Sequence, residues 1–124
     1  MLELGSAPTD KAPADMIKDV TEATFMADVI DASMTVPVIV DFWAPWCGPC
    51  RAMAPQFEAA AAQLEPGFRL AKIDTEAQPA LGGRFGIRSI PTLVLFRQGR
   101  ELARQAGAIG TADIVRWARQ NLPH

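Results

Sequence analysis

The stretch Trp46-Cys47-Gly48-Pro49-Cys50 constrains this chain more than any other, because it holds the only two cysteines among 124 residues. A nearly continuous apolar run from Val36 to Trp43 comes directly before it, and a helix-like run starts near Arg51. The apolar run is typical of a strand that is covered on both faces. Two sulfurs three residues apart at a strand-to-helix turn are placed to exchange electrons as a dithiol and a disulfide.

Composition limits the classes of protein that this chain can represent. Apolar residues make up 49% and charged residues 21% of the sequence, as in ordinary globular proteins, and the length suits one domain. A formal net charge of −2 gives no basic surface for nucleic acid. We find no apolar run that predicts a membrane span or a signal peptide. We therefore expect a flexible tail over residues 1–15, one domain over residues 16–124, and a cytoplasmic location.

A reducing location makes a lone pair of close cysteines catalytic or metal-binding rather than a structural crosslink. A zinc site needs four ligands, or three and a water, and the chain offers only two cysteines and His124. A cysteine–histidine hydrolase is equally disfavoured, because a base at the last position of a chain is poorly held.

The hydrophobic pattern predicts alternating strands and helices. The β-branched and alternating apolar segments predict strands over residues 17–20, 36–42, 68–73, 92–96 and 100–106. Helical spacing predicts helices over residues 22–32, from the cysteines to about residue 64, over 79–84 and over 111–122, with Thr21 and Thr111 as caps. This order predicts an α/β fold in which a central mixed sheet of about five strands has about four helices on its two faces.

With these elements placed, two distant segments resemble the thioredoxin family. Residues 41–51, which read Asp-Phe-Trp-Ala-Pro-Trp-Cys-Gly-Pro-Cys-Arg, are similar to its active-site segment. Residues 85–92, which read Phe-Gly-Ile-Arg-Ser-Ile-Pro-Thr, resemble a second segment of the family, and so does Gly107, which follows the last expected strand. The resemblance runs from about Val20 to Leu122 and implies the thioredoxin fold. Ala44-Pro45 and the Arg-Ser-Ile before Pro91 resemble the second type of bacterial thioredoxin, but the leader holds no cysteine, so we expect its zinc-binding extension to be absent.

The spacing and the resemblance together assign roles to the cysteines. Residues i and i+3 of a helical turn are close enough for a disulfide, and a helix N-terminus favours an anion, so the pKa of Cys47 should be lowered. Cys47 would attack a substrate disulfide, and the more buried Cys50 would resolve the mixed disulfide. Gly48 and Pro49 would set the redox poise. Because oxidising relatives usually carry a histidine in this loop, Pro49 favours a reductant.

Asp41 and Lys72 are the candidates for proton transfer. The residues alone leave Asp41 either turned to water at a strand end or buried with a raised pKa, and leave Lys72 as a possible surface lysine. The resemblance implies a buried Asp41 that takes the proton of Cys50, through a water, with Lys72 tuning it.

A substrate-binding patch is implied by the same resemblance. Most X-Pro bonds are trans, but the resemblance implies a cis bond between Ile90 and Pro91 that would expose the Ile90 backbone to an extended substrate. Trp46, Ile90, Gly107 and Ala108 would line the patch, with Trp43 packed behind it.

The expected function is that of a monomeric, general protein-disulfide reductase. It would bind no cofactor or metal, receive electrons from an NADPH-dependent thioredoxin reductase, and act on disulfide-containing proteins rather than on nucleic acids or membranes. Two alternatives remain: a disulfide oxidase or isomerase, and a binding module that uses the fold without turnover.

Overall fold

The computed structural model describes residues 16–122, so the predicted tail over residues 1–15 and the C-terminal His124 lie outside the described residues. The strands are β1 (Ile17–Asp19), β2 (Val38–Trp43), β3 (Arg69–Asp74), β4 (Thr92–Arg97) and β5 (Arg100–Ala106). The helical segments are η3 (Met26–Asp31), η4 (Ala32–Met34), α1 (Gly48–Leu64), α2 (Pro79–Arg84) and α3 (Thr111–Gln120).

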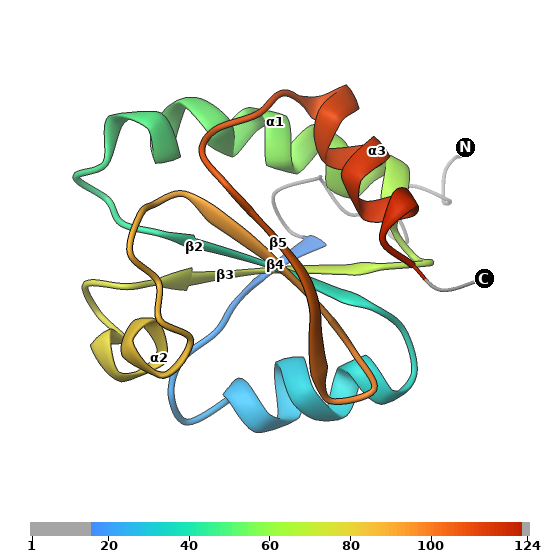
Figure 1. The fold of residues 1–124 in the computed structure, drawn as a ribbon, viewed down its shortest axis with the longest axis horizontal. Coiled ribbons are helices and arrows are strands. Elements are labelled where there is room, and N and C mark those ends of the chain that lie inside the picture. The colour runs from blue at the N-terminus through green and yellow to red at the C-terminus, as the bar shows by residue number, and fades with distance from the viewer. Residues whose placement is uncertain (1–15, 123–124) are drawn as a thin grey trace, which may run out of the picture.

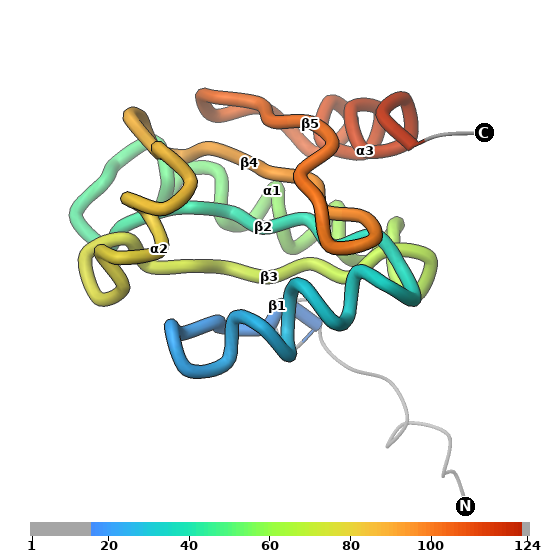
Figure 2. Tube along the Cα trace, turned by 60° about the horizontal axis from the view of Figure 1, so that its bottom comes forward, coloured from blue at the N-terminus to red at the C-terminus, as the bar shows by residue number. Residues whose placement is uncertain are grey.

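The five strands form one mixed sheet in the order β1-β3-β2-β4-β5, which confirms the predicted α/β architecture (Figure 2). β1, β3 and β2 are parallel to one another, and β4 pairs antiparallel with β2. β5 pairs antiparallel with β4, so β4 is the one strand of the five that runs in the opposite direction. β2 therefore lies at the centre of the sheet, and β1 and β5 form its two edges. The apolar run that precedes the cysteines is this central strand.

Two helical layers cover the sheet (Figure 1). α1 and α3 lie on one face, and η3, η4 and α2 lie on the other. Alternation along β2 divides its side chains between the layers, as the two-residue period of a strand requires. Ile39 packs in the core under α1 and α3, whereas Val38, Val40 and Phe42 pack in the core on the opposite face.

The predicted first helix is only partly correct. A turn occupies residues 22–24, and the segment that follows is a π-helix and then a short 3-10 helix. Thr21 and Thr24 exchange hydrogen bonds, in which the Thr24 N–H donates to Thr21 Oγ1 and the Thr21 N–H donates to Thr24 Oγ1 (3.3 and 3.0 Å). Glu22 is not part of the helix: it lies in the turn, and its carboxylate accepts a hydrogen bond from the Ala80 N–H in the first turn of α2 (3.1 Å). The helical segment therefore begins later in the sequence than predicted, because residues 21–24 make hydrogen bonds with one another and with α2.

The predicted cap of the last helix is also wrong in detail. Gly110 is the N-cap of α3, and Thr111 is its first residue. The Thr111 hydroxyl donates instead to Gln56 Oε1 of α1 (2.6 Å). Thr111 thus ties the two helices of this layer together.

Candidate functional site

The two cysteines lie where β2 gives way to α1. Cys47 is the N-cap of α1, Gly48 and Pro49 occupy its first positions, and Cys50 lies in the first turn. Pro49 suits this turn because backbone donors at the start of a helix have no partner inside the helix. The Cα atoms of the cysteines are 5.2 Å apart and the pair is disulfide-bonded. This geometry holds two sulfurs at the positive end of a 17-residue helix.

Little of either cysteine is open to solvent. Cys47 is 5% exposed and Cys50 is 2% exposed. The Cys50 N–H donates to Cys47 Sγ at 3.2 Å. A backbone donor aimed at this sulfur would stabilise a thiolate there, because hydrogen bonding to a charged form favours that form.

Asp41 is fully buried in the central strand, three residues before Ala44 in the turn to the cysteines. It shares the α1 face of the sheet with Ile39 by strand alternation. Neither carboxylate oxygen has a hydrogen-bond partner among the described residues. Burial raises the pKa of Asp41 from its usual 3.8 to about 7, and the positive charge of Lys72 opposes this rise. The carboxyl group therefore titrates close to neutral pH.

Lys72 stands directly opposite Asp41 in the parallel pairing of β2 with β3. Its ammonium lies 4.2 Å from the ring centroid of Trp43, an attractive cation–π arrangement. Trp43 in turn packs against the buried cluster of Ala44, Cys47 and Cys50. Trp43 therefore connects the ammonium group to the disulfide by direct packing.

Ile90 and Pro91 approach the cysteines from the start of β4. The bond between them is cis, and the Ile90 carbonyl oxygen lies 3.7 Å from Cys47 Sγ. The Pro91 carbonyl accepts from the Gly107 N–H at 2.9 Å. Gly107 has φ +93°, a left-handed conformation that favours glycine, and Ala108 beside it is exposed. The sequence-predicted residues 90, 91 and 107 are thus brought together beside the sulfur.

A small cavity of about 210 Å³ opens beside this loop. Its lining consists of Trp46, Thr75, Gly82, Ile87, Arg88, Ser89 and Ile90. Trp46 is 67% exposed, which is unusual for so large an apolar side chain. Gly107 and Ala108 do not line this cavity. Thr75 and Arg88 are additional lining residues that local sequence patterns did not indicate, although Arg88 lies inside the segment that resembles the family.

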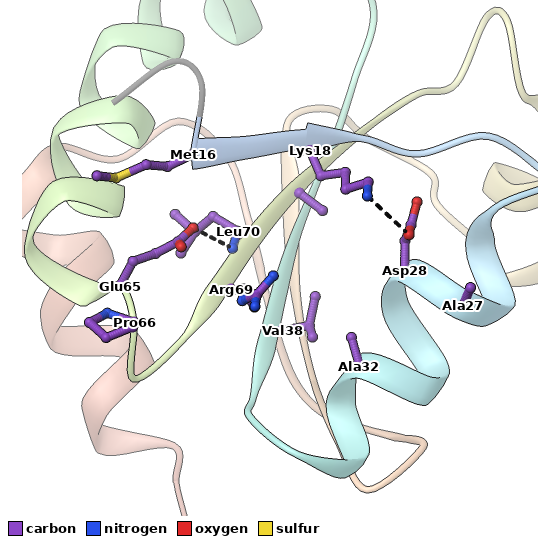
Figure 3. A pocket seen from close by; sticks show the side chains of 11 residues that line it. Met16, Lys18, Ala27, Asp28, Ala32, Val38, Glu65, Pro66, Arg69 and Leu70 are labelled. Atoms are coloured by element: carbon purple, nitrogen blue, oxygen red, sulfur yellow. Dashed lines mark hydrogen bonds and ion pairs between the residues drawn. The ribbon is translucent and has the colours of Figure 1, made fainter. Parts of the chain in front are cut away.

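Two larger cavities lie away from the cysteines. One of about 620 Å³ is bordered by Val38 and Arg69, the first residues of β2 and β3 (Figure 3). The disulfide lies beyond the other end of β2, after its last residue, Trp43. An ion pair between Lys18 and Asp28 (3.4 Å) lines one side of this cavity. The other cavity, of about 840 Å³, lies between α1 and α3. Neither is lined by any of the residues that surround the sulfurs.

Residues 16–122 contain no group of three or more histidine, cysteine, aspartate or glutamate side chains that could hold a metal ion. Across the same residues, every helix is too short or too polar to cross a membrane.

Comparison with known proteins gives a consistent result. The family model described as Thioredoxin matches residues 16–120. Thioredoxin 1 of Nostoc sp. is 46% identical over 83% of this chain and 94% of its own length. A thioredoxin of Mycobacterium bovis is 40% identical over 94% of this chain and 97% of its own length. The bifunctional thioredoxin reductase/thioredoxin of Mycobacterium leprae is 40% identical over 90% of this chain, which matches 24% of that longer protein.

Proposed function

This chain belongs to the thioredoxin family of thiol–disulfide oxidoreductases, and we propose that it is a general protein-disulfide reductase supplied with electrons by an NADPH-dependent thioredoxin reductase. The observation that carries the proposal is the Cys47–Cys50 disulfide at the start of α1, together with the buried Asp41 in β2, the strand that leads into the cysteine turn.

The reaction begins with the dithiol form. The Cys47 thiolate attacks one sulfur of a substrate disulfide and releases the other sulfur as a thiolate, which gives a mixed disulfide. The Cys50 thiol then loses its proton and attacks Cys47 Sγ. A second substrate thiolate leaves, the Cys47–Cys50 bond closes, and two electrons have passed to the substrate. The helix N-terminus and the Cys50 N–H support the thiolate at Cys47.

Asp41 takes the proton of Cys50, through a water molecule. A group is an efficient general base when its pKa lies close to the working pH, and burial raises the pKa of Asp41 to about 7. Lys72 limits this rise, because its positive charge favours the ionised carboxylate. Lys72 is thus a tuning residue rather than a proton carrier.

Substrate binds across the surface formed by Trp46, Ile90 and Pro91, with Gly107 and Ala108 at its margin. The exposed Trp46 supplies apolar contact area, and the Ile90 carbonyl beside Cys47 accepts a backbone hydrogen bond from an extended substrate segment. Recognition through main chain makes the site tolerant of many protein sequences.

Electron donor, location and oligomeric state are parts of the same proposal. The fused reductase and thioredoxin named in the M. leprae relative support a thioredoxin reductase as the donor. Pro49 between the cysteines supports a reductant, because the loop lacks the histidine that stabilises the thiolate of an oxidant. We propose a cytoplasmic monomer.

The test is NADPH-coupled reduction of insulin in the presence of a thioredoxin reductase. The wild-type protein should give continuous NADPH oxidation, and Cys47→Ser, which lacks the nucleophile, should give only the background rate. Absence of turnover by the wild-type protein would refute the proposal. Efficient oxidation of a reduced, unfolded protein in place of insulin reduction would favour the oxidase alternative.

A further inference from the structure

A β-bulge in β5 places two charged side chains on the same face of the sheet. Arg104 stands opposite Val94 of β4, and Glu101 stands opposite Phe96, with the register shifted between these pairs so that Leu102 has no partner in the register. Residues three apart in a regular strand point to opposite faces. Here both side chains lie on the face of Val94 and Phe96, which is the face covered by α2.

The shared face allows Glu101 to orient the Arg104 guanidinium. The Glu101 carboxylate accepts from Arg104 Nε at 2.6 Å and from Nη2 at 2.8 Å, a two-point contact that fixes the plane of the guanidinium group. Nη2 also donates to the carbonyl oxygen of Phe85 at 2.9 Å. Arg104 therefore connects the edge strand to the residue that ends α2.

Phe85 begins the loop that leads to Pro91. Its ring packs against Phe25 and Phe96 at 5.4 Å and against Phe42 at 6.0 Å between ring centroids. The aromatic contacts fix the Phe85 side chain, and Arg104 fixes its backbone. The next residue, Gly86, has φ +61°, so the chain turns sharply just beyond the contact with Arg104.

Both ends of this loop are held by hydrogen bonds from the same part of the chain: Arg104 lies in β5, and Gly107 directly follows β5. Arg104 holds the carbonyl of Phe85, and the Gly107 N–H holds the carbonyl of Pro91 (2.9 Å). Between these two anchors lie residues 87–90, which line the small cavity and present the Ile90 carbonyl 3.7 Å from Cys47 Sγ.

We propose that Arg104, oriented by Glu101, is a positioning residue for substrate binding: it holds the loop over residues 85–91 in the position that docks a protein disulfide against Cys47. The inference rests on the proposed docking surface beside Ile90. A protein substrate uses that surface, whereas a small disulfide needs only the sulfurs. Loss of Arg104 should therefore weaken binding of protein substrates without slowing the chemistry.

The experiment compares Arg104→Gln with Arg100→Gln. Arg100 lies on the same strand and is exposed, so its replacement removes the same charge but not the contact with Phe85. For Arg104→Gln we expect the KM for insulin to rise about threefold to tenfold, as for loss of one ordinary hydrogen bond at an exposed position, with kcat little changed. Reduction of hydroxyethyl disulfide, which is small and neutral, should proceed at the wild-type rate in both variants.

A second measurement does not need a substrate. Amide hydrogen exchange at residues 86–90 should be about tenfold faster in Arg104→Gln than in the wild-type protein and unchanged in Arg100→Gln. Glu101→Gln should also make exchange at residues 86–90 faster, but by less than Arg104→Gln. This change weakens the contact that orients Arg104 but leaves the guanidinium that donates to the Phe85 carbonyl.

The outcomes separate this inference from the proposed function. If wild-type protein reduces insulin but Arg104→Gln has an unchanged KM, the inference is overturned while the proposed function stands. If wild-type protein fails to reduce insulin, the proposed function fails and hydrogen exchange alone decides whether Arg104 holds the loop. Equal effects of Arg104→Gln and Arg100→Gln on the KM would assign the change to net charge and overturn the inference.

Discussion

Replacing Asp41 by asparagine should remove a pH-dependent loss of stability that the wild-type protein carries. The side chain is fully buried, and burial raises its pKa from 3.8 to about 7. Below about pH 4 the Asp41 carboxyl is protonated in both the folded and the unfolded protein, so its ionisation does not change the free energy of unfolding. As the pH rises to 7, the unfolded protein releases the proton and the folded protein keeps it, so the free energy of unfolding falls.

The size of this fall follows from the shift in pKa. A rise of about three pKa units corresponds to a loss of about 4 kcal/mol between about pH 4 and pH 8. Asparagine has nearly the same shape and does not ionise, so Asp41→Asn should show none of this fall. The stability difference between variant and wild type should therefore move by about 4 kcal/mol in favour of the variant as the pH rises over this range.

The assay is urea denaturation of both oxidised proteins at a series of pH values. Every other titrating group is common to the two proteins, so the difference between them isolates Asp41. Asp31→Asn, which removes an exposed carboxylate in η3, controls for the change in net charge. If the wild-type and Asp41→Asn stabilities ran parallel from about pH 4 to pH 8, the assignment of a buried carboxyl that titrates near neutral pH would be refuted.

Three other changes test the site. Cys50→Ser should accumulate a mixed disulfide between Cys47 and a protein substrate, visible as a larger species on a non-reducing gel; no adduct would contradict the assigned order of attack. Pro49→His should shift the equilibrium with glutathione toward the dithiol form, because a histidine cation stabilises the Cys47 thiolate and makes the protein a stronger oxidant; an unchanged equilibrium constant would contradict the role of Pro49. Lys72→Met removes the positive charge that lowers the pKa of Asp41, so the titration of Asp41 followed by infrared absorption of its carboxyl should move to a pH above about 7; a shift in the opposite direction would show that Lys72 does not act through its charge.

Local patterns predicted most of the fold. The bounds of α2 and β5 agree with those expected from sequence, because Pro79 suits a first helical position and a tight turn after the apolar strand β4 marks where β5 begins. Gln98 and Gly99 form that turn with φ +53° and +78°, a conformation typical of tight hairpins. The cysteines and Asp41 could be placed for the same reason, since they lie at the end of one strand and the start of one helix.

Features that depend on distant contacts could not be predicted. Local spacing predicts Glu22 in the first turn of its own helix, but its carboxylate accepts a hydrogen bond from the Ala80 N–H, more than fifty residues away. Nothing in the local pattern indicates that the Glu65–Pro66 bond is cis. Sequence spacing would place Glu101 and Arg104 on opposite faces of β5, and only the bulge brings them together. Long-range pairing and register decide these details, and neither leaves a periodic signal.

The two edges of the sheet differ in what they offer to other chains. β1 has only three residues, so few unpaired backbone groups are available along that side for another strand to join. β5 has seven, but its side chains include three charged residues and a bulge that interrupts its outer row of donors and acceptors. Short, charged and irregular edges are poor templates for edge-to-edge pairing. The bulge that aligns Arg104 with Glu101 therefore also protects the longer edge against aggregation.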